Sequence, residues 1–431
     1  MKQRKQEKEH GWYRLDNAAK LFPSISNTEN SNVFRMVCEL TESVDRNTLQ
    51  TAAEKTLAVF PSFRVRLRRG LFWNFLEYNP NPFKIHRDIH PPCSYFKGIS
   101  QRGYLFEVSY YKNKINLDLF HVLADGTGAM QFLRMLVYHY LQIAHERELT
   151  ESTIPDNCLA TPSSRSEDAF HKYYQKSKKD APFEKKAYRI TGSKLMPGEI
   201  KIITGHMPVK QVLQLAKSHQ ATLTTYLTAV VIYSIYENMP ARKRKRPVKV
   251  NIPVNLRNHF PSVTSRNFFA CIETGYTFDQ QQPTFEQVLE QVNQQVKGQL
   301  SSDKLSQRIN FTVATEKNPI VRCLPLALKD IGLKIAYKQG EIAYSTALSN
   351  MGKVSMPEYL QPYIKNFNLI MSPSPFQPVK FGVCSYGDTL NFTYSAAMEP
   401  VDIPRHIFRY LSKQGVEVTI TTNEVKRDET V

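Results

Sequence analysis

The first half of the chain alternates segments with the pattern of strands and segments with the pattern of helices. Short apolar or alternating runs predict strands at 33–40, 63–68, 104–111 and 115–121. A helix is expected from about residue 45 until just before Pro61, which ends it. After Gly126, apolar residues recur at helical spacing as far as Ala144. The pattern therefore predicts a strand, a tight turn and a helix between residues 115 and 144.

The second half repeats this mixture after a segment of a different character. Residues 150–198 are rich in Ser, Pro and Lys and have little periodicity, which is typical of an exposed crossover without a core of its own. Beyond it we expect helices at 208–220, 223–238 and 403–413, and strands at 199–207, 248–254, 379–383, 390–394 and 416–422. The interpretation is an α/β (α+β) protein with a lobe at 1–149, a linker at 150–198 and a lobe at 199–431.

Composition supports a folded protein of two lobes. The chain has 431 residues, of which 41% are hydrophobic and 22% charged, which excludes global disorder. The longest apolar stretch, near 223–236, is interrupted by Thr and Ser, so no membrane span is expected. The charged first ten residues lack the apolar core of a signal peptide, and the cytoplasm is the predicted compartment. The six cysteines form no CxxC pair, so we expect reduced thiols and no metal cluster.

The net charge of +18, from 57 Lys and Arg against 39 Asp and Glu, predicts an anionic partner. The run Arg242–Arg246 reads RKRKR before a proline. A solvated loop is the preferred interpretation of this run, because the chain contains no nucleic-acid-binding motif. Nucleic acid is therefore not an expected partner.

The segment from His121 to Gly128, HVLADGTG, has the strongest chemical signal. His121 lies at the end of a predicted strand on its apolar side, and Asp125 and Gly126 follow at the turn before the helix. An imidazole at a strand end can act as a general base near neutral pH. An isolated motif of this kind also suits a structural histidine that bonds a backbone carbonyl. Asp125 would by itself suit an N-cap of the following helix.

Further motifs, in order along the chain, extend the signal. The HxxxDG motif resembles that of the chloramphenicol acetyltransferase-like superfamily, which includes condensation domains, plant acyl-CoA-dependent acyltransferases and alcohol O-acetyltransferases. Bacterial alcohol O-acetyltransferase-like proteins are the most similar group. The segments that carry this resemblance are Phe60–Phe63, Arg68–Trp73, Pro253–Arg257, Arg266–Phe269 and Leu348–Gly352.

The resemblance implies a fold and a set of roles. Two chloramphenicol acetyltransferase-like lobes, each a mixed sheet with helices, would enclose an active-site channel. His121 would be the general base for attack of a hydroxyl on an acyl thioester, without a covalent acyl-enzyme. Asp125 would support the motif by pairing with a cation, for which Arg257 is the candidate, and Gly126 would permit the turn.

Stabilisation of the oxyanion requires hydrogen-bond donors in the channel. Asn255, Ser349 and Asn350 are the candidates, although each residue type is also common in turns. No metal site and no permanently bound cofactor are expected, since neither HExxH nor GxGxxG occurs. Acetyl-CoA or another acyl-CoA is the expected co-substrate.

Three functions remain open at this stage. The first is an acyl-CoA-dependent alcohol O-acyltransferase that acts on an alcohol acceptor. The second is a condensation-like enzyme that takes its acyl group from an acyl carrier protein and forms an ester or an amide. Condensation domains usually have a second His immediately before the motif His, and Phe120 occupies that position here. The third is a basic binding protein that has the fold without catalysis.

Overall fold

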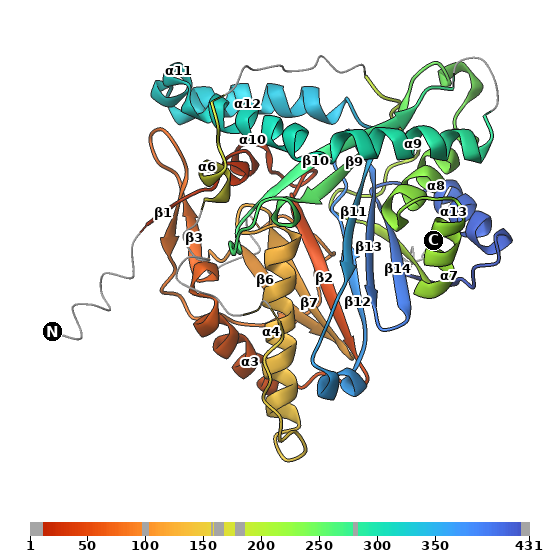
Figure 1. Ribbon diagram of the computed structural model, residues 1–431. Coiled ribbons are helices and arrows are strands. Elements are labelled where there is room, and N and C mark those ends of the chain that lie inside the picture. Colours follow the sequence, from red (N-terminus) through yellow and green to blue (C-terminus); the bar gives the residue numbers. More distant parts are fainter. Residues whose placement is uncertain are drawn as a thin grey trace, which may run out of the picture.

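The computed structural model describes residues 12–96, 103–156, 158, 168–176, 186–278 and 283–423. Two sheets lie side by side, one built mainly from the first third of the chain and the other from the second half (Figure 1). Helices cover their outer faces. Most predicted elements are confirmed within a few residues, including the strand at 33–40 and the helix after Gly126.

The first sheet has five strands in the order β12-β2-β7-β6-β5. Their bounds are β2 (Val33–Leu40), β5 (His86–Arg87), β6 (Phe106–Tyr111), β7 (Lys114–Phe120) and β12 (Ile364–Ile370). Helices α3 (Arg46–Val59) and α4 (Gly126–Ala144) pack together against it. Asp45 caps α3, because its carboxylate accepts the Thr48 N–H at 2.8 Å.

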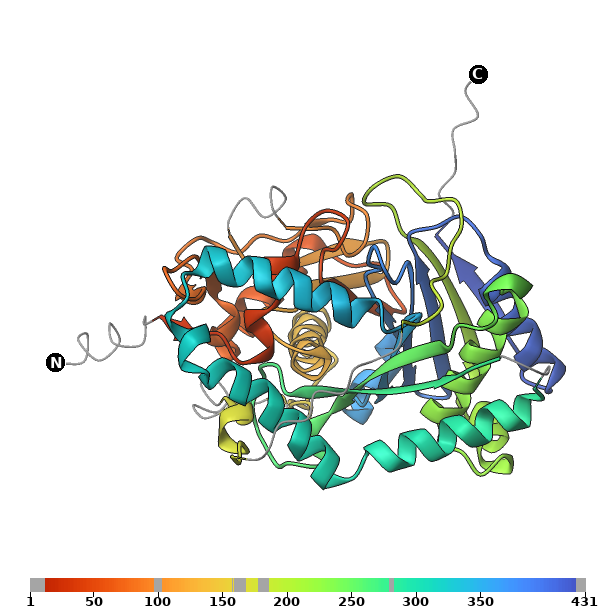
Figure 2. The same ribbon diagram turned by 90° about the horizontal axis from the view of Figure 1, so that it is seen from above.

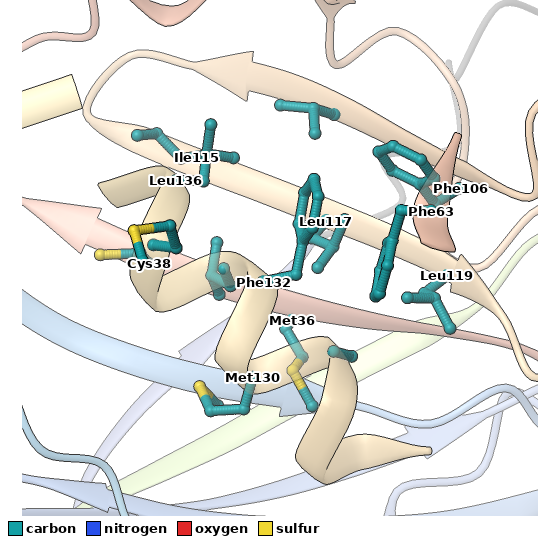
Figure 3. Close-up of a cluster of buried hydrophobic side chains, with 14 of the residues drawn as sticks. Met36, Cys38, Phe63, Phe106, Ile115, Leu117, Leu119, Met130, Phe132 and Leu136 are labelled. Carbon is teal, nitrogen blue, oxygen red and sulfur yellow. The ribbon is translucent and has the colours of Figure 1, made fainter. Parts of the chain in front are cut away.

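The core of the first lobe lies between this sheet and α4. Alternate residues of β7 point to the helix, and so do residues of β2 (Figure 3). Phe63, Phe106 and Phe132 form an aromatic cluster in which the Phe63 and Phe132 rings stack at 4.6 Å. This packing fixes the end of β7 relative to the start of α4, and the turn between them carries HVLADGTG.

The second sheet has seven strands in the order β10-β9-β11-β13-β14-β8-β15. Their bounds are β8 (Lys201–Pro208), β9 (Val248–Asn255), β10 (Phe269–Tyr276), β11 (Thr346–Lys353), β13 (Val379–Tyr386), β14 (Thr389–Ala396) and β15 (Thr419–Thr422). Its helices are α7 (Val209–Ser218), α8 (Leu223–Glu237), α9 (Phe285–Gln299) and α13 (Asp402–Lys413). β11 is parallel to β9 and β13, while the other pairs are antiparallel, so the sheet is mixed.

The remaining elements lie on the periphery. A small sheet consists of β1 (Tyr13–Arg14), β4 (Phe75–Tyr78) and β3 (Val65–Arg68), and the short helix α2 (Phe22–Ile25) packs on α12 (Leu326–Glu341). Helices α10 (Ser302–Lys317), α11 (Pro319–Cys323) and α12 were not predicted from the sequence; α12 crosses the upper face of the first lobe (Figure 2). Short 3₁₀ helices occur at Ala18–Lys20, Pro61–Phe63, Ala241–Lys243, Leu256–Asn258 and Glu358–Tyr363.

Strand β12 joins the two lobes. It belongs to the second half of the chain, yet it pairs antiparallel with β2 of the first sheet. Its other side faces β14 through buried amides, because Asn366 and Asn391 exchange side-chain hydrogen bonds at 2.6 and 3.2 Å. Asn368 bonds Thr393 at 2.6 Å in the same way. The lobe boundaries given above stay a prediction. Strand β12 is a segment of the second half of the chain that belongs to the first sheet.

The linker differs from the expected exposed crossover. Cys158 is buried in the first core, and α6 (Ala169–Lys172) and Tyr188 contribute to the second. Its few apolar residues therefore attach it to both lobes even though they lack periodicity. Residues 159–167 and 177–185 of the linker lie outside the described part of the chain.

Candidate active site

His121 follows the last residue of β7 and sits where the two lobes meet. Antiparallel pairing places Val33 opposite Phe120, and the His121 backbone N–H donates to the Asn32 carbonyl at 3.0 Å. The imidazole lines a cavity of about 490 Å³ that also includes residues of β9, β10, β11 and β13. The predicted strand-end position therefore opens onto a space shared by both lobes.

A buried asparagine from the second lobe sets the orientation of the imidazole. Asn267 lies in the β9–β10 hairpin, which Figure 1 shows reaching from the second lobe toward the start of α4. Its Nδ2 donates to Asp16 Oδ2 at 3.1 Å and to the His121 carbonyl at 3.0 Å. Its Oδ1 therefore faces His121 Nδ1, at 3.0 Å. Since an amide oxygen only accepts, Nδ1 must carry the proton, and Nε2 is left with a free lone pair.

Asp16 anchors this arrangement from the N-terminal segment. Its carboxylate is 1% exposed and also accepts the Ala19 N–H at 2.8 Å. Burial raises the pKa of Asp16 to about 6, and the nearby charge of Arg266 opposes that rise. The carboxylate is therefore mainly ionised at pH 7, the form that accepts three hydrogen bonds, two from Asn267 and one from Ala19.

Aromatic side chains surround the His121 ring. Phe22 stacks on it with ring centroids 4.7 Å apart, and Phe34 meets it edge-on at 5.1 Å. Phe269 lies 5.3 Å away on a further side. Burial lowers the pKa of His121 below its usual 6.5, while the Asn267 hydrogen bond and the charge of Asp125 oppose this. The imidazole is therefore neutral at pH 7, the state that a general base requires.

Asp125 has both structural contacts considered from the sequence. Its Oδ1 accepts the Gly128 N–H at 3.1 Å and so caps α4. Its Oδ2 accepts Arg257 Nη1 at 2.8 Å and the Phe268 N–H at 2.8 Å. The structure thus brings together Asp125 and Arg257, and the second oxygen of the carboxylate bonds groups of the second lobe.

Arg257 also organises the loop that carries Asn267. Its guanidinium donates to the backbone carbonyls of Thr264 and Arg266, and to Asn255 Oδ1 at 3.1 Å. The side chains of Arg257 and Asp125 are 10% and 6% exposed, so water competes little for these bonds. The ion pair therefore fixes the motif turn and the Asn267 loop to each other.

Two glycines permit this close approach. Gly126 was expected for the turn, but it begins α4, and its φ is not among the positive values found in the described residues. A Cβ there would lie 2.6 Å from Sδ of the flexible Met351 side chain, which would have to shift. At Gly128 a Cβ would lie 2.0 Å from the Ser265 carbonyl oxygen. The second lobe thus packs directly against the backbone of the motif.

The three candidate oxyanion donors line the same cavity as His121. Asn350 donates through Nδ2 to Thr224 Oγ1 at 2.9 Å and accepts the Gly352 N–H at 2.8 Å. Asn255 Oδ1 accepts the Arg257 N–H at 3.1 Å, the turn bond that the residue type suggested. Asn255 and Asn350 therefore both have structural hydrogen bonds, whereas Ser349 is a half-buried residue of β11 that lines the cavity.

Sequence reasoning missed several residues around the cavity. Asn267 was part of a recognised segment but had no assigned role, and Asp16 was not considered. Lys380 of β13 also lines the cavity. A second cavity of about 520 Å³ shares Ser372 with the first and is bounded by residues 189–200 and 372–378. Ser31 and Ser372, whose hydroxyl oxygens are 2.9 Å apart, stand between the two.

In the part of the chain that the structure describes, no group of three or more His, Cys, Asp or Glu side chains could hold a metal ion. No helix formed by those same residues has the length and apolar character to cross a membrane.

Comparisons with solved structures define the fold. A trichothecene 15-O-acetyltransferase from Fusarium sporotrichioides has 10% identity and a TM-score of 0.62, with 94% of each chain covered. A Fusarium graminearum acetyltransferase with coenzyme A and deoxynivalenol has 11% identity and a TM-score of 0.63, covering 95% of this chain and 99% of that one. The first condensation domain of the calcium-dependent antibiotic synthetase has 12% identity and a TM-score of 0.58, covering 94% and 95%.

The fold is therefore that of the two-lobed chloramphenicol acetyltransferase-like proteins, as predicted. Residues 166–297 match the family model described as alcohol acetyltransferase. A search among curated protein sequences gave no match. The fold and the family match confirm the predicted resemblance, and the description of the matching family model is that of an acyltransferase.

Proposed function

We propose that this protein is an acyl-CoA-dependent O-acyltransferase that transfers an acyl group, acetyl in the first instance, to an alcohol. The observation that carries the proposal is the contact of Asn267 Oδ1 with His121 Nδ1 at 3.0 Å. It fixes the tautomer with the proton on Nδ1 and leaves Nε2 as a base in a cavity between two lobes. The alcohol acetyltransferase family match and the coenzyme A in similar structures support the choice of substrates.

The chemistry follows from that tautomer. Nε2 takes the hydroxyl proton while the alcohol oxygen attacks the thioester carbonyl carbon, and a tetrahedral oxyanion forms. The carbon–sulfur bond then breaks, the ester leaves, and the thiolate takes the proton back from the imidazolium to give free CoA. Asn267 accepts a stronger hydrogen bond from the imidazolium than from the neutral ring.

Other residues hold the reacting groups rather than react. Asp125 and Arg257 keep the turn of His121 attached to the second lobe. Ser349 and Asn255 are our candidate donors to the oxyanion, because the Arg257 bond to Asn255 engages its Oδ1 and not its Nδ2, whereas Asn350 Nδ2 already donates to Thr224. Gly126 and Gly128 permit the close contact of the lobes. We infer that the two cavities joined at Ser372 form the two arms of a substrate channel.

The test is CoA formation from acetyl-CoA in the presence of a panel of alcohols. Chromatography is the suitable readout, because the exposed thiol of Cys323 would react with a thiol reagent. His121→Ala should lower the rate by about 10²- to 10⁴-fold, the usual contribution of a positioned base. His90→Ala, an exposed histidine on the surface of the first lobe, is the matched control and should retain the rate. A His121→Ala rate within a few-fold of the unmodified protein would refute the assignment.

A donor on an acyl carrier protein is the alternative. The structural likeness to a condensation domain keeps it in consideration, while Phe120 at the position of the usual second His favours CoA. Comparing acetyl-CoA with an acetylated carrier protein, under the same conditions and with the same alcohols, decides between them. A preference for the carrier protein would replace the proposed donor and leave the role of His121 in place. A folded protein that turns over neither donor would favour the non-catalytic binding protein.

A further inference from the structure

Helix α12 has apolar side chains on two opposite faces. On its inner face, Leu326 is buried, and Lys329 donates through Nζ to the carbonyls of Phe72 and Arg322 at 2.9 and 3.2 Å. The helix packs on α2, where Ser24 Oγ donates to Asp330 Oδ1 at 2.6 Å. These contacts fix the rotation of the helix about its axis.

The outer face is apolar along most of the helix. Leu328, Ile331 and Ile335 are 55%, 58% and 56% exposed. Their spacing of three and four residues puts them on one face, and Figure 2 shows α12 on the upper side of the molecule. We call these three residues the outer α12 surface. Three further exposed apolar residues adjoin the start of the helix: Leu71, Phe72 and Ile320 are 72%, 44% and 73% exposed.

These three neighbours adjoin the helix. The Leu326 N–H donates to the Leu71 carbonyl at 2.8 Å, so the loop that carries Leu71 and Phe72 lies against the start of α12. Ile320 belongs to α11, which ends at Cys323, three residues before α12 begins. These contacts lie on the Leu326 and Lys329 side of the helix, so the outer α12 surface consists of Leu328, Ile331 and Ile335 alone. Three exposed aliphatic side chains on one helical face are a candidate interaction site.

The charge around the outer α12 surface is positive. Residues 319–341 contain four Lys or Arg and two Asp or Glu. Both carboxylates are bound inward: Asp330 accepts Arg69 Nη2 at 2.7 Å, and Glu341 bonds Gln377 at 3.0 Å and also Ser374. The cations Arg322, Lys334 and Lys338 are exposed. The outer α12 surface thus presents aliphatic side chains with basic residues beside them.

We propose that the outer α12 surface binds an anionic lipid membrane, with α12 lying in the headgroup region. The side chains of Leu328, Ile331 and Ile335 would insert among the lipid acyl chains, and Lys334 and Lys338 would pair with lipid phosphates. Two other occupants fit less well: a second copy would bring the exposed cations Lys334 and Lys338 close to those of its partner, and a nucleic acid would leave the aliphatic residues in water. This inference is independent of the proposed function, since it involves no residue of the His121 cavity.

The experiment is co-sedimentation of the full chain with vesicles. Phosphatidylcholine vesicles with added phosphatidylglycerol should carry the protein down, phosphatidylcholine alone should do so weakly, and added salt should reduce binding. The test variant combines Leu328→Gln, Ile331→Gln and Ile335→Gln. The matched control combines Ile89→Gln, Val263→Gln and Ile420→Gln, which are 74%, 58% and 53% exposed elsewhere on the surface.

The test variant should lose about ten-fold or more in vesicle affinity, while the control should bind as the unmodified protein does. Circular dichroism and thermal unfolding establish that both are folded. If the triple change unfolds the protein, Lys334→Glu with Lys338→Glu replaces it and should weaken binding to the anionic vesicles. Equal binding by test and control variants would overturn the proposal. So would an absence of vesicle binding together with a dimer that the test variant makes monomeric.

Discussion

Replacing Asn267 by leucine tests the orientation of the base without removing the base. Leucine has the branched shape and the same number of side-chain heavy atoms as asparagine, although its methyl groups are larger, and its side chain cannot bond His121 Nδ1 or Asp16. A neutral hydrogen bond contributes about 1 kcal/mol net and one to a charged group about 1.5–3 kcal/mol. The imidazole becomes charged during the reaction, so only the difference, about 0.5–2 kcal/mol, acts on the rate. We expect the rate of Asn267→Leu to fall by about 2- to 30-fold.

The pH profile gives a second readout that a merely structural role would not move. The Asn267 hydrogen bond favours the imidazolium and raises the pKa of His121 against the larger effect of burial. Its removal should lower that pKa, so the acid limb of the rate profile should move to lower pH. Stability should also fall by about 1–3 kcal/mol, because the Asp16 carboxylate loses a buried donor.

The assay is CoA formation across pH, with thermal unfolding measured alongside. Asn368→Leu is the control, since it removes a half-buried amide that bonds Thr393 and Thr204 and does not line the His121 cavity. It should lose stability and keep its acid limb in place. Two results would contradict the tautomer argument. One is a hundred-fold loss of rate in Asn267→Leu with the acid limb of the pH profile unchanged, and the other is an acid limb displaced to higher pH.

Three further results are expected. Asp125→Ala should destabilise the protein by about 3–5 kcal/mol in denaturant unfolding, because Arg257 would remain buried without its partner; full stability would contradict the structural role. The unmodified enzyme should be active at pH 7 and lose activity only below pH 6.5, where protonation of His121, whose pKa burial lowers, removes the base; a midpoint above 6.5 would argue for another base. Gly128→Ala should lower the melting temperature, because its Cβ would meet the Ser265 carbonyl; an unchanged temperature would show that the lobes can separate there.

The sequence predicted the elements around His121 because their signals are local. The alternation before Phe120 and the helical spacing after Gly126 each involve neighbouring residues. The contacts that orient the imidazole come from Asn267 and Asp16, which are 251 residues apart, and no local pattern connects them. The pairing of Asp125 with Arg257 came from family resemblance and not from spacing.

Two other elements, β12 and α12, were missed because their patterns of polar and apolar residues indicate a different burial from the one observed. In β12, Asn366 and Asn368 read as a solvent-facing side, yet they bond Asn391 and Thr393 of the other sheet. In α12, exposed aliphatic residues obscure the amphipathic period that identifies a surface helix. Sequence periodicity assumes one polar and one apolar face, and both elements violate that assumption.

The position of β12 has a consequence for synthesis of the chain. A growing polypeptide can pair β2 with β7 early, but the other edge of β2 stays open until Ile370 has left the ribosome. An open edge can pair with a strand of another molecule. During most of translation, a second nascent chain could donate its own β12 to that edge, which would produce a strand-exchanged dimer. Synthesis of several chains side by side on one messenger RNA should therefore give more strand-exchanged dimer than refolding of the purified chain at low concentration does.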